Sequence, residues 1–447
     1  MADLPVPTRP GAGHGPLLRI AAPITLVSLS TPLVGAVDTA VVGRLGDPAL
    51  IGGIAAAAVL FNLIFLTLGF LRFSTTGLAA QAVGAGAHDD AAAVLVRAGV
   101  LAVGLGALVI GAELLAGGFA LDLLAVDGAV RAAALAYADI RVLSAPFVFA
   151  NFALLGWLIG TGAIGRAVVL QVLLNLVNIG ASVWLVVHAG WGVRGAALAA
   201  VIAEAATFAA GALMVAARLR DRRGRSRREE GHIAVVARVR RMLAINGDIL
   251  VRSVVLFLVI ALFTRQGARF GTVTLAANAV LLNLFYLAGA FMSGLATAAQ
   301  QTAGQALGAG DRGAFERVVR LALLWGALGS LLLTAVYGLA GDRLIGLMTA
   351  DAAVAATARS ALGWAVAVPL AGLVAFIADG VFIGATWARD ARNMMLVSAG
   401  LFVAAWATLV PAFGNDGLWA AFLLFLAVRG LSLALRYPPL LRTTFGG

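Results

Sequence analysis

The chain has 447 residues, of which 62% are hydrophobic and only 12% are charged. A soluble protein carries roughly 25% charged residues, so this composition excludes an ordinary soluble domain and predicts a membrane protein. Cys is absent, which excludes disulfides, iron–sulfur clusters and thiolate zinc sites, and the four His are scattered without metal-ligand spacing. All 32 basic residues are Arg, and the formal net charge is +11.

Apolar runs recur along the whole chain, and each is long enough to cross a bilayer, which takes about 20 residues. The polar start MADLPVPTRPGAGHGP does not resemble a cleavable signal peptide, so we expect the first run to be retained. We therefore predict an all-α polytopic membrane protein with twelve transmembrane helices. The predicted spans are 17–43, 50–80, 93–118, 133–160, 167–188, 194–217, 242–265, 273–304, 317–340, 358–386, 393–413 and 417–437.

One strongly basic segment separates the sixth and seventh spans. Residues 218–241 contain ten Arg and three acids. A nucleic-acid-binding arm would have this charge, but a basic loop between spans is typical of the cytoplasmic side, and we expect no nucleic-acid partner. With this loop inside, 21 Arg lie in predicted inside segments and 8 in outside segments. We therefore expect a multi-pass protein of the inner (cytoplasmic) membrane with both termini in the cytoplasm.

An internal repeat divides the chain. QAVGAG at 81–86 recurs as QALGAG at 305–310. The shift in residue number from 81 to 305 is called the repeat offset, and it also relates Ile159–Gly160 to Ile383–Gly384. Phe61-Asn62-Leu63 resembles Leu282-Asn283-Leu284 at a slightly smaller shift. Six spans per half is an even number, so the repeat is parallel, and such pairs bracket a central cavity. We predict an N-terminal lobe at 1–217, a cytoplasmic linker at 218–241 and a C-terminal lobe at 242–447, related by pseudo-symmetry.

Acidic residues inside predicted spans are candidates for ion coupling, because a charge in lipid is costly unless it is paired or functional. Asp38 lies among small residues near the outer end of the first span, where a carboxyl can bind and release a proton. Alternatively, Asp38 is a residue at the end of the helix that pairs with Arg44. Asp379 lies toward the inner side of the tenth span and is either functional or paired with a base. The repeat duplicates neither acid.

Other polar residues within the spans have more ordinary explanations beside functional ones. Asp248 and Arg252 are four residues apart on one helix, which favours a self-neutralising pair. Arg72 has no such local partner and is either a structural clamp or an anion contact. Asn175 and Asn178 form a polar stripe on the fifth span that can support a carboxylate or an ion. We expect Asn62 and Asn283 to be symmetry mates lining one cavity with nearby aromatic residues, including Phe61 and Phe285.

Several segments, in order and over nearly the whole length, resemble the multidrug and toxic compound extrusion (MATE) family, within it the DinF-like branch. These segments are VDTAVVGRLG, FLRFSTTGLAAQAVGAG, WGVRGAALAAVIAE, NGDILVRS, GQALGAGD and DGVFIGATWARDARNMM. The resemblance implies two six-helix lobes around a cavity that opens alternately to each face. It also implies export of amphiphilic, often cationic, small molecules in exchange for H⁺ or Na⁺, without another cofactor and without enzymatic activity.

The resemblance also implies roles for individual residues. The first-span Asp of the family falls on Asp38, the bending Pro of that helix on Pro23, and the fifth-span Asn on Asn178. The second-span Arg falls on Arg72 and the tenth-span Asp on Asp379.

The chain departs from the family at three places. Ser182 replaces an Asp that many relatives have in the fifth span, Ala200 replaces a sixth-span Thr, and the eighth span GAFMSGLATAAQQ is neutral where relatives often have acids. These losses favour H⁺ over Na⁺, since a lone carboxyl binds a proton but is a poor cation cage. In the resulting hypothesis, protonation of Asp38 changes its hydrogen bonds with Asn178 and the first helix bends near Pro23, which expels the substrate.

Three other functions have different requirements. A lipid-linked oligosaccharide flippase of the same superfamily would need a strongly basic cavity. An intramembrane enzyme would need paired Asp motifs, GxSxG or metal-ligand His, and none appears in a predicted span. A channel fits poorly with two unlike halves. We expect a monomeric carrier whose partners are small-molecule substrates and the lipid bilayer.

Overall fold

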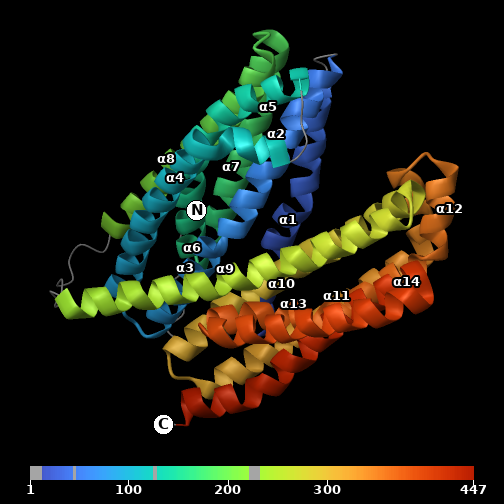
Figure 1. Cartoon of the computed structure of the whole chain (residues 1–447). Coiled ribbons are helices and arrows are strands. Elements are labelled where there is room, and N and C mark those ends of the chain that lie inside the picture. Colours follow the sequence, from blue (N-terminus) through green and yellow to red (C-terminus); the bar gives the residue numbers. More distant parts are fainter. Residues whose placement is uncertain (1–12, 44–46, 124–127, 221–231, 447) are drawn as a thin grey trace. The chain divides into compact units, whose positions relative to one another are not determined.

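The computed structural model describes residues 13–43, 47–123, 128–220 and 232–446, and places their side chains except those of 30–40, 42, 66, 120–123, 220 and 232–235. The described residues are helical and joined by short turns (Figure 1). The helices are α1 (His14–Gly43), α2 (Pro48–Leu68), α3 (Phe70–Gly84), α4 (His88–Leu123), α5 (Gly128–Arg141), a 3₁₀ turn η1 (Val142–Ser144), α6 (Ala145–Gly160), α7 (Ile164–Ser182), a π-helix η2 (Val183–His188), α8 (Gly192–Arg220), α9 (His232–Arg269), α10 (Thr272–Gly308), α11 (Arg312–Met348), α12 (Ala352–Ser360), α13 (Leu362–Gly384) and α14 (Ala388–Phe445).

The predicted all-helical membrane fold with twelve helices is confirmed. Within the described residues, ten helical segments are long and apolar enough to cross a membrane, and His14–Leu29 is a shorter apolar helix in α1. The last of the ten, α14, is two helices that meet at Gly414, where the backbone is non-helical with φ 57°. With α14 counted as two helices and α1 added, the described segments make twelve helices. Pairs such as α2 with α3 and α5 with α6 follow one another within a single span. Most of the predicted Arg-rich linker lies outside the described residues.

The chain divides into two compact units. The N-terminal unit comprises Ser30–Met242, and the C-terminal unit comprises the chain up to Leu29 together with Leu243–Gly447. This division differs from the predicted lobes at the first helix, because the first half of α1 groups with the C-terminal unit. There the Thr25 hydroxyl donates to the Phe291 carbonyl at 3.2 Å, and the Ser293 hydroxyl donates to that of Ser28 at 2.8 Å. The lobe boundaries stay a prediction.

The internal repeat is visible in the helix boundaries. Helices α2, α4, α5 and α7 begin at Pro48, His88, Gly128 and Ile164, and the starts of α10, α11, α12 and α14 follow them at the repeat offset in each case. The repeated motif ends α3 and α10 in the same way. Gly86 and Gly310 have φ of 70° and 68°, and each donates to a carbonyl three residues earlier at 3.0 Å. Glycine has no Cβ, so it ends helices in this left-handed conformation without strain.

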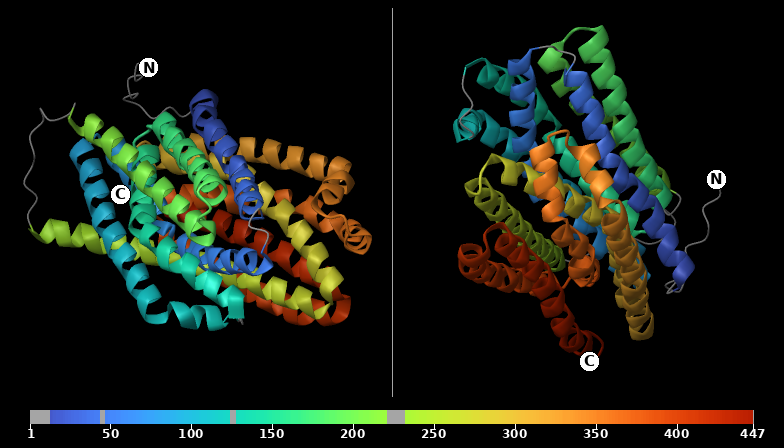
Figure 2. Two further views of the ribbon diagram at one scale, coloured as in Figure 1. Left: turned by 90° about the horizontal axis from the view of Figure 1, so that it is seen from above. Right: turned by 90° about the vertical axis from the view of Figure 1, so that its right-hand side faces the viewer.

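Small residues set the closest helix contacts in both units. Gly156 and Gly160 of α6 lie against the carbonyls of Arg72 and Thr76 of α3, where an added Cβ would clash. The corresponding contacts recur at the repeat offset in the C-terminal unit, where α13 lies against α10. In that unit α13 packs against α10, α11 and α14, and α10 also packs against α11. Figure 2 shows these helices, coloured orange to red, from two further directions. Small residues allow such close approach between helices in lipid.

Candidate functional site

A cavity of about 370 Å³ lies inside the N-terminal unit, and we call it the N-terminal cavity. It brings together three residues predicted from the sequence, Phe61, Asn62 and Asn178. Two of the three places at which the sequence departs from the expected family pattern, Ser182 and Ala200, also line it. The remaining lining residues are Val41, Ile51, Ile54, Ala55, Ala58, Tyr137, Arg141 and Ala196. Asn175, which was predicted beside Asn178, does not line this cavity.

Helix α7 carries Asn178 into this cavity and changes to a π-helix directly after Ser182. A π-helical turn widens the helix and is frequent at functional sites. The Asn178 side-chain oxygen is buried and has no hydrogen-bond partner among the described residues. A buried oxygen without a partner is uncommon in proteins, because it loses its interaction with water. This acceptor is therefore available to a proton-bearing group or a ligand.

Arg141 brings a positive charge to the N-terminal cavity, and it was not among the residues predicted from the sequence. It ends α5 and donates through Nη1 to the Ser144 hydroxyl at 2.7 Å. Its guanidinium carbon lies 5.3 Å from the centre of the Phe65 ring, which is a cation–π distance. The signal in the sequence is one Arg inside the fourth apolar run. Among the described residues that line the cavity, Arg141 is the only charged one.

A second polar pair of the N-terminal unit joins α6 to α8. The Asn151 amide donates to the Glu204 carboxylate at 2.8 Å and to the Glu204 carbonyl at 2.9 Å. Glu204 is thus hydrogen-bonded to a neutral partner rather than paired in a direct salt bridge among the described residues.

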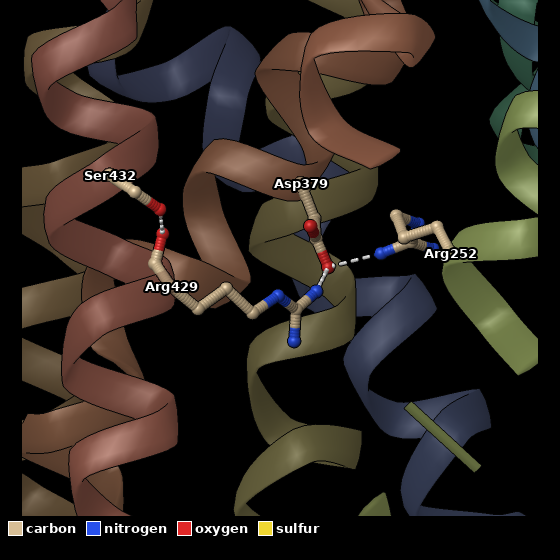
Figure 3. A network of polar contacts seen from close by, with 4 residues as sticks. All are labelled: Arg252, Asp379, Arg429 and Ser432. Carbon is tan, nitrogen blue, oxygen red and sulfur yellow. Dashed lines mark hydrogen bonds and ion pairs between the residues drawn. The ribbon is translucent and has the colours of Figure 1, made fainter. Parts of the chain in front are cut away.

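The C-terminal unit holds a buried charge cluster around Asp379, shown in Figure 3. Arg252 of α9 donates to the Asp379 carboxylate at 2.7 Å, and Arg429 of α14 donates to the same oxygen. The side chain of Arg429 is 4% exposed and that of Asp379 is 19% exposed. Two guanidinium groups on one carboxylate leave the cluster with a net positive charge. This arrangement satisfies a buried acid, but it does not suit an Asp that must bind a further cation.

The expected Asp248–Arg252 pair is wrong. Asp248 accepts instead from Arg392 of α14 at 2.6 Å, while Arg252 reaches Asp379. Residues four apart on a helix can meet, but the exposed pairs they form are weak. Partners on neighbouring helices hold these two side chains instead.

The symmetry assignment of Asn62 to Asn283 is also wrong. Because the starts of α2 and α10 are related by the repeat offset, Asn62 corresponds to Tyr286 and Phe61 corresponds to Phe285. Phe61 is 3% exposed and Phe285 is 6% exposed, so a buried Phe occupies the same place in each repeat. Phe285 contacts the rings of Phe376 and Phe422, at 6.2 Å and 5.3 Å between centroids, in the C-terminal unit. Asn283 is an exposed residue of α10.

The remaining predicted residues lie as follows. Asp38 belongs to α1, but its side chain lies outside the described residues. Pro23 lies in the first half of α1, two residues before Thr25, which binds α10. Arg72 lies in α3 with its guanidinium carbon 4.8 Å from the centre of the Phe73 ring. Within the described part of the chain, no carboxylate forms an ion pair with Arg72, so its clamp and anion-contact roles stay predictions.

Comparison with known proteins identifies the family. The MatE family model matches residues 23–184 and 249–407, which is most of the chain. The chain belongs to the MatE family. It is 42% identical over 418 residues to DNA damage-inducible protein F of Escherichia coli K12, covering 94% of this chain and 90% of that protein. It is a MATE transporter rather than an enzyme.

Solved structures of MATE transporters share this fold. The crystal structure of an Asp-to-Asn mutant of the Vibrio cholerae MATE transporter VcmN matches with a TM-score of 0.85 at 20% identity, covering 97% of this chain and 98% of that one. An outward-facing multidrug resistance MATE transporter of the MOP superfamily matches with a TM-score of 0.83 at 19% identity, covering 100% of both chains.

Proposed function

We propose that this MATE-type multidrug transporter is a proton-coupled antiporter that exports amphiphilic, often cationic, compounds by alternating access. Asp38 is the proton-binding carboxyl and Asn178 is its polar partner. The observation that carries the proposal is the buried Asn178 oxygen in the N-terminal cavity, which has no hydrogen-bond partner among the described residues. Asp38 lies in α1 one helical turn before Val41, which lines the same cavity.

The chemistry of the lining favours H⁺ over Na⁺. Within its described part, the cavity offers a cation only neutral oxygens, such as those of Asn178, Ser182 and Tyr137, and it contains the positive charge of Arg141. A hard cation requires several oxygen ligands, usually with carboxylates among them, whereas one carboxyl is enough to bind a proton. When Asp38 is protonated, its O–H can donate to the Asn178 oxygen, and when it is charged it cannot. The two protonation states thus favour different conformations of α1.

The Asp379 cluster takes a different part in this proposal. Because Arg252 and Arg429 already neutralise Asp379, we assign it to the stability of the C-terminal unit and to gating, not to ion binding. Pro23 and the contacts of Thr25 and Ser28 with α10 are consistent with a hinge in α1, since Pro removes one helix hydrogen bond. The Arg distribution along the sequence supports cytoplasmic termini in the inner membrane, and we propose that the carrier acts as a monomer.

Arg141 favours a second candidate function. A guanidinium in the cavity suits an anionic amphiphile, such as a lipid-linked oligosaccharide, better than a cation. This flippase-like function needs no proton-binding carboxyl. It predicts that Arg141→Gln abolishes transport while Asp38→Asn does not, whereas the antiporter proposal predicts the opposite order of effects.

The test is efflux of a fluorescent organic cation from proteoliposomes with an imposed pH gradient or an imposed Na⁺ gradient. We expect the wild type to respond to the pH gradient alone and Asp38→Asn to lose at least about 90% of this efflux, since a proton site is removed entirely. The matched control is Asp47→Asn. Asp47 is an exposed acid that caps α2 by accepting from Ala49 N–H at 2.8 Å, and Asn caps helices equally well.

Two outcomes would contradict the antiporter. Efflux driven by Na⁺ would replace proton coupling by Na⁺ coupling, and efflux unaffected by Asp38→Asn would remove this residue from coupling. If no gradient drives the cation while a fluorescent anionic lipid is translocated, the flippase-like function replaces the proposal.

A further inference from the structure

A groove of about 420 Å³ lies in the C-terminal unit, and we call it the α11–α14 groove. Its floor is α13, which packs against both α11 and α14, and those two helices form its walls. Ten of its thirteen lining side chains are apolar, and the three polar ones are Glu316, Arg320 and Tyr437. The volume is that of a small-molecule site, which spans about 300–1,000 Å³.

The groove lies toward one end of its three helices. Arg320 follows the start of α11 by eight residues, or about 12 Å. Phe382 on the floor is two residues before the end of α13, and Tyr437 is in the last turns of α14. An aromatic cluster closes this end, because Phe315 stacks on Tyr437 at 6.4 Å and Trp387 contacts Phe382 at 5.4 Å between ring centroids. The walls are therefore held in place without a ligand.

The charges at the groove leave one cation available. Glu316 is paired with Arg312 at 2.8 Å. Arg320 is exposed, and it forms no ion pair within the part of the chain that the structure describes. The Tyr437 hydroxyl likewise has no hydrogen-bond partner among the described residues, although it lines the same groove. An acidic group placed there would meet the guanidinium of Arg320 and the hydroxyl of Tyr437, beside a Glu316 carboxylate that Arg312 already neutralises.

The N-terminal repeat lacks this arrangement. At the repeat offset, which the starts of α4 and α11 share, Glu316 corresponds to Ala92 and Arg320 corresponds to Val96. Val96 is 67% exposed, so the surface of α4 that corresponds to Arg320 is apolar. The repeat shows that the fold does not require polar groups at these positions, which argues for a ligand that uses them.

We propose that the α11–α14 groove binds an anionic phospholipid, with an acyl chain on the apolar floor and the acidic headgroup on Arg320 and Tyr437. In a membrane, an open apolar groove is filled from the bilayer. A basic side chain near the end of the spans selects an acidic headgroup, as in pockets between transmembrane helices that bind anionic lipids. A cationic compound is disfavoured by Arg320, and a neutral lipid lacks the charge. The proposal does not depend on what the protein exports.

The test is native mass spectrometry of the detergent-purified full-length protein titrated with phosphatidylglycerol or phosphatidylcholine of the same acyl chains. We expect selective binding of phosphatidylglycerol that Arg320→Gln weakens about fivefold, the factor for losing one Arg beside an acidic headgroup. The matched control is Arg317→Gln, which removes the same charge from an exposed position of α11 that does not line the groove, and should leave binding unchanged.

A second variant tests the apolar part. Ala434 is an exposed lining residue, and Ala434→Trp should fill the groove and weaken phosphatidylglycerol binding without removing a charge. Melting temperatures of all variants check that each is folded. Equal binding of the two lipids, equal effects of Arg317→Gln and Arg320→Gln, or unchanged binding in Ala434→Trp would each overturn the proposal. Displacement of the lipid by inorganic phosphate would reassign the groove to free anions.

Discussion

The two units are built from one repeated backbone but have different polar interiors. In the N-terminal unit, α6 and α8 are joined by Asn151 and Glu204, one neutral and one acidic residue, and a cavity contains an unpartnered Asn178 oxygen among the described residues. In the C-terminal unit, the corresponding helices α13 and α14 are joined by Asp379 and Arg429. In the N-terminal unit the acid of this helix pair lies on α8, whereas in the C-terminal unit it lies on α13, the counterpart of α6. Among the described residues, only the C-terminal acid is paired with guanidinium groups.

This difference separates two uses of buried polar groups. A carboxylate held by two guanidinium groups is locked, because removing any member leaves an unpaired charge in a poorly solvated place. A side-chain oxygen without a partner can accept a hydrogen bond when a neighbour changes its protonation state. In the proposed antiporter, the C-terminal unit is therefore assigned to a rigid frame and the N-terminal unit to the part that responds to protonation.

The largest expected effect is the loss of stability on substitution of Asp379, compared with that of Glu204. Asp379→Asn leaves Arg252 and Arg429 without their anion, and breaking a buried ion cluster in this way should lower the free energy of unfolding by about 3–5 kcal/mol. Glu204→Gln keeps an oxygen that can accept from Asn151 and should cost about 1 kcal/mol or less. Chemical denaturation in mixed micelles measures both. Equal losses in the two variants would remove the distinction between the units.

A smaller effect should be equal in the two units. Gly156→Ala and Gly380→Ala each place a methyl group against a backbone carbonyl, that of Arg72 and that of Ala296. Backbone cannot move aside easily, so each variant should lose about 1–3 kcal/mol of unfolding free energy. Gly400→Ala is the control, since its added methyl group meets open space and should be neutral or slightly stabilising. A loss confined to one unit would show that the repeat is not equally packed.

Much of this fold follows from the sequence because its signals are local and periodic. Long apolar runs give the spans, and the motif at 81–86 and 305–310 gives the repeat offset, which the helix starts reproduce at four places. The looser match of Phe61-Asn62-Leu63 at a smaller shift failed, since two or three similar residues in an apolar run recur by chance. The structure places buried Phe61 and Phe285 in register instead.

The polar contacts were harder to predict because they join residues far apart in sequence. Asp248 and Arg252 fit a local pair, but their partners Arg392 and Asp379 belong to other helices, far along the chain. Phe61, Asn62 and Asn178 do share a cavity, whereas Arg141 was missed because one Arg in an apolar run does not reveal what it faces. Spacing predicts which residues share a helix face and not which helix lies opposite.

Double-mutant cycles within the C-terminal unit can test whether Asp248 pairs with Arg392 rather than with Arg252. Asp248→Asn and Arg392→Gln should couple by about 1 kcal/mol, because the pair at 2.6 Å is only partly exposed. Asp248→Asn and Arg252→Gln should couple by about 0.3 kcal/mol or less, since Arg252 binds Asp379. Denaturation of the four proteins in each cycle gives the coupling energy. A larger value for the Asp248–Arg252 cycle would restore the local pair and contradict the observed contacts.

The smallest effect concerns a turn that differs between the repeats. Gly162, after α6, has φ 80°, and the corresponding residue after α13 is Thr386 with φ 57°. A left-handed conformation costs an L-residue roughly 1–2 kcal/mol, and Gly loses about 0.5–1 kcal/mol of backbone entropy on folding, so Thr386→Gly should stabilise the protein by about 0.5 kcal/mol. Thr386→Asn, which tolerates this conformation and keeps a polar side chain, should give an intermediate gain. Gly162→Thr should be destabilising by a similar or larger amount, because it adds the same strain to the N-terminal repeat. If Thr386→Gly instead lowers the melting temperature, the contacts of the Thr386 side chain stabilise the turn by more than the strain costs.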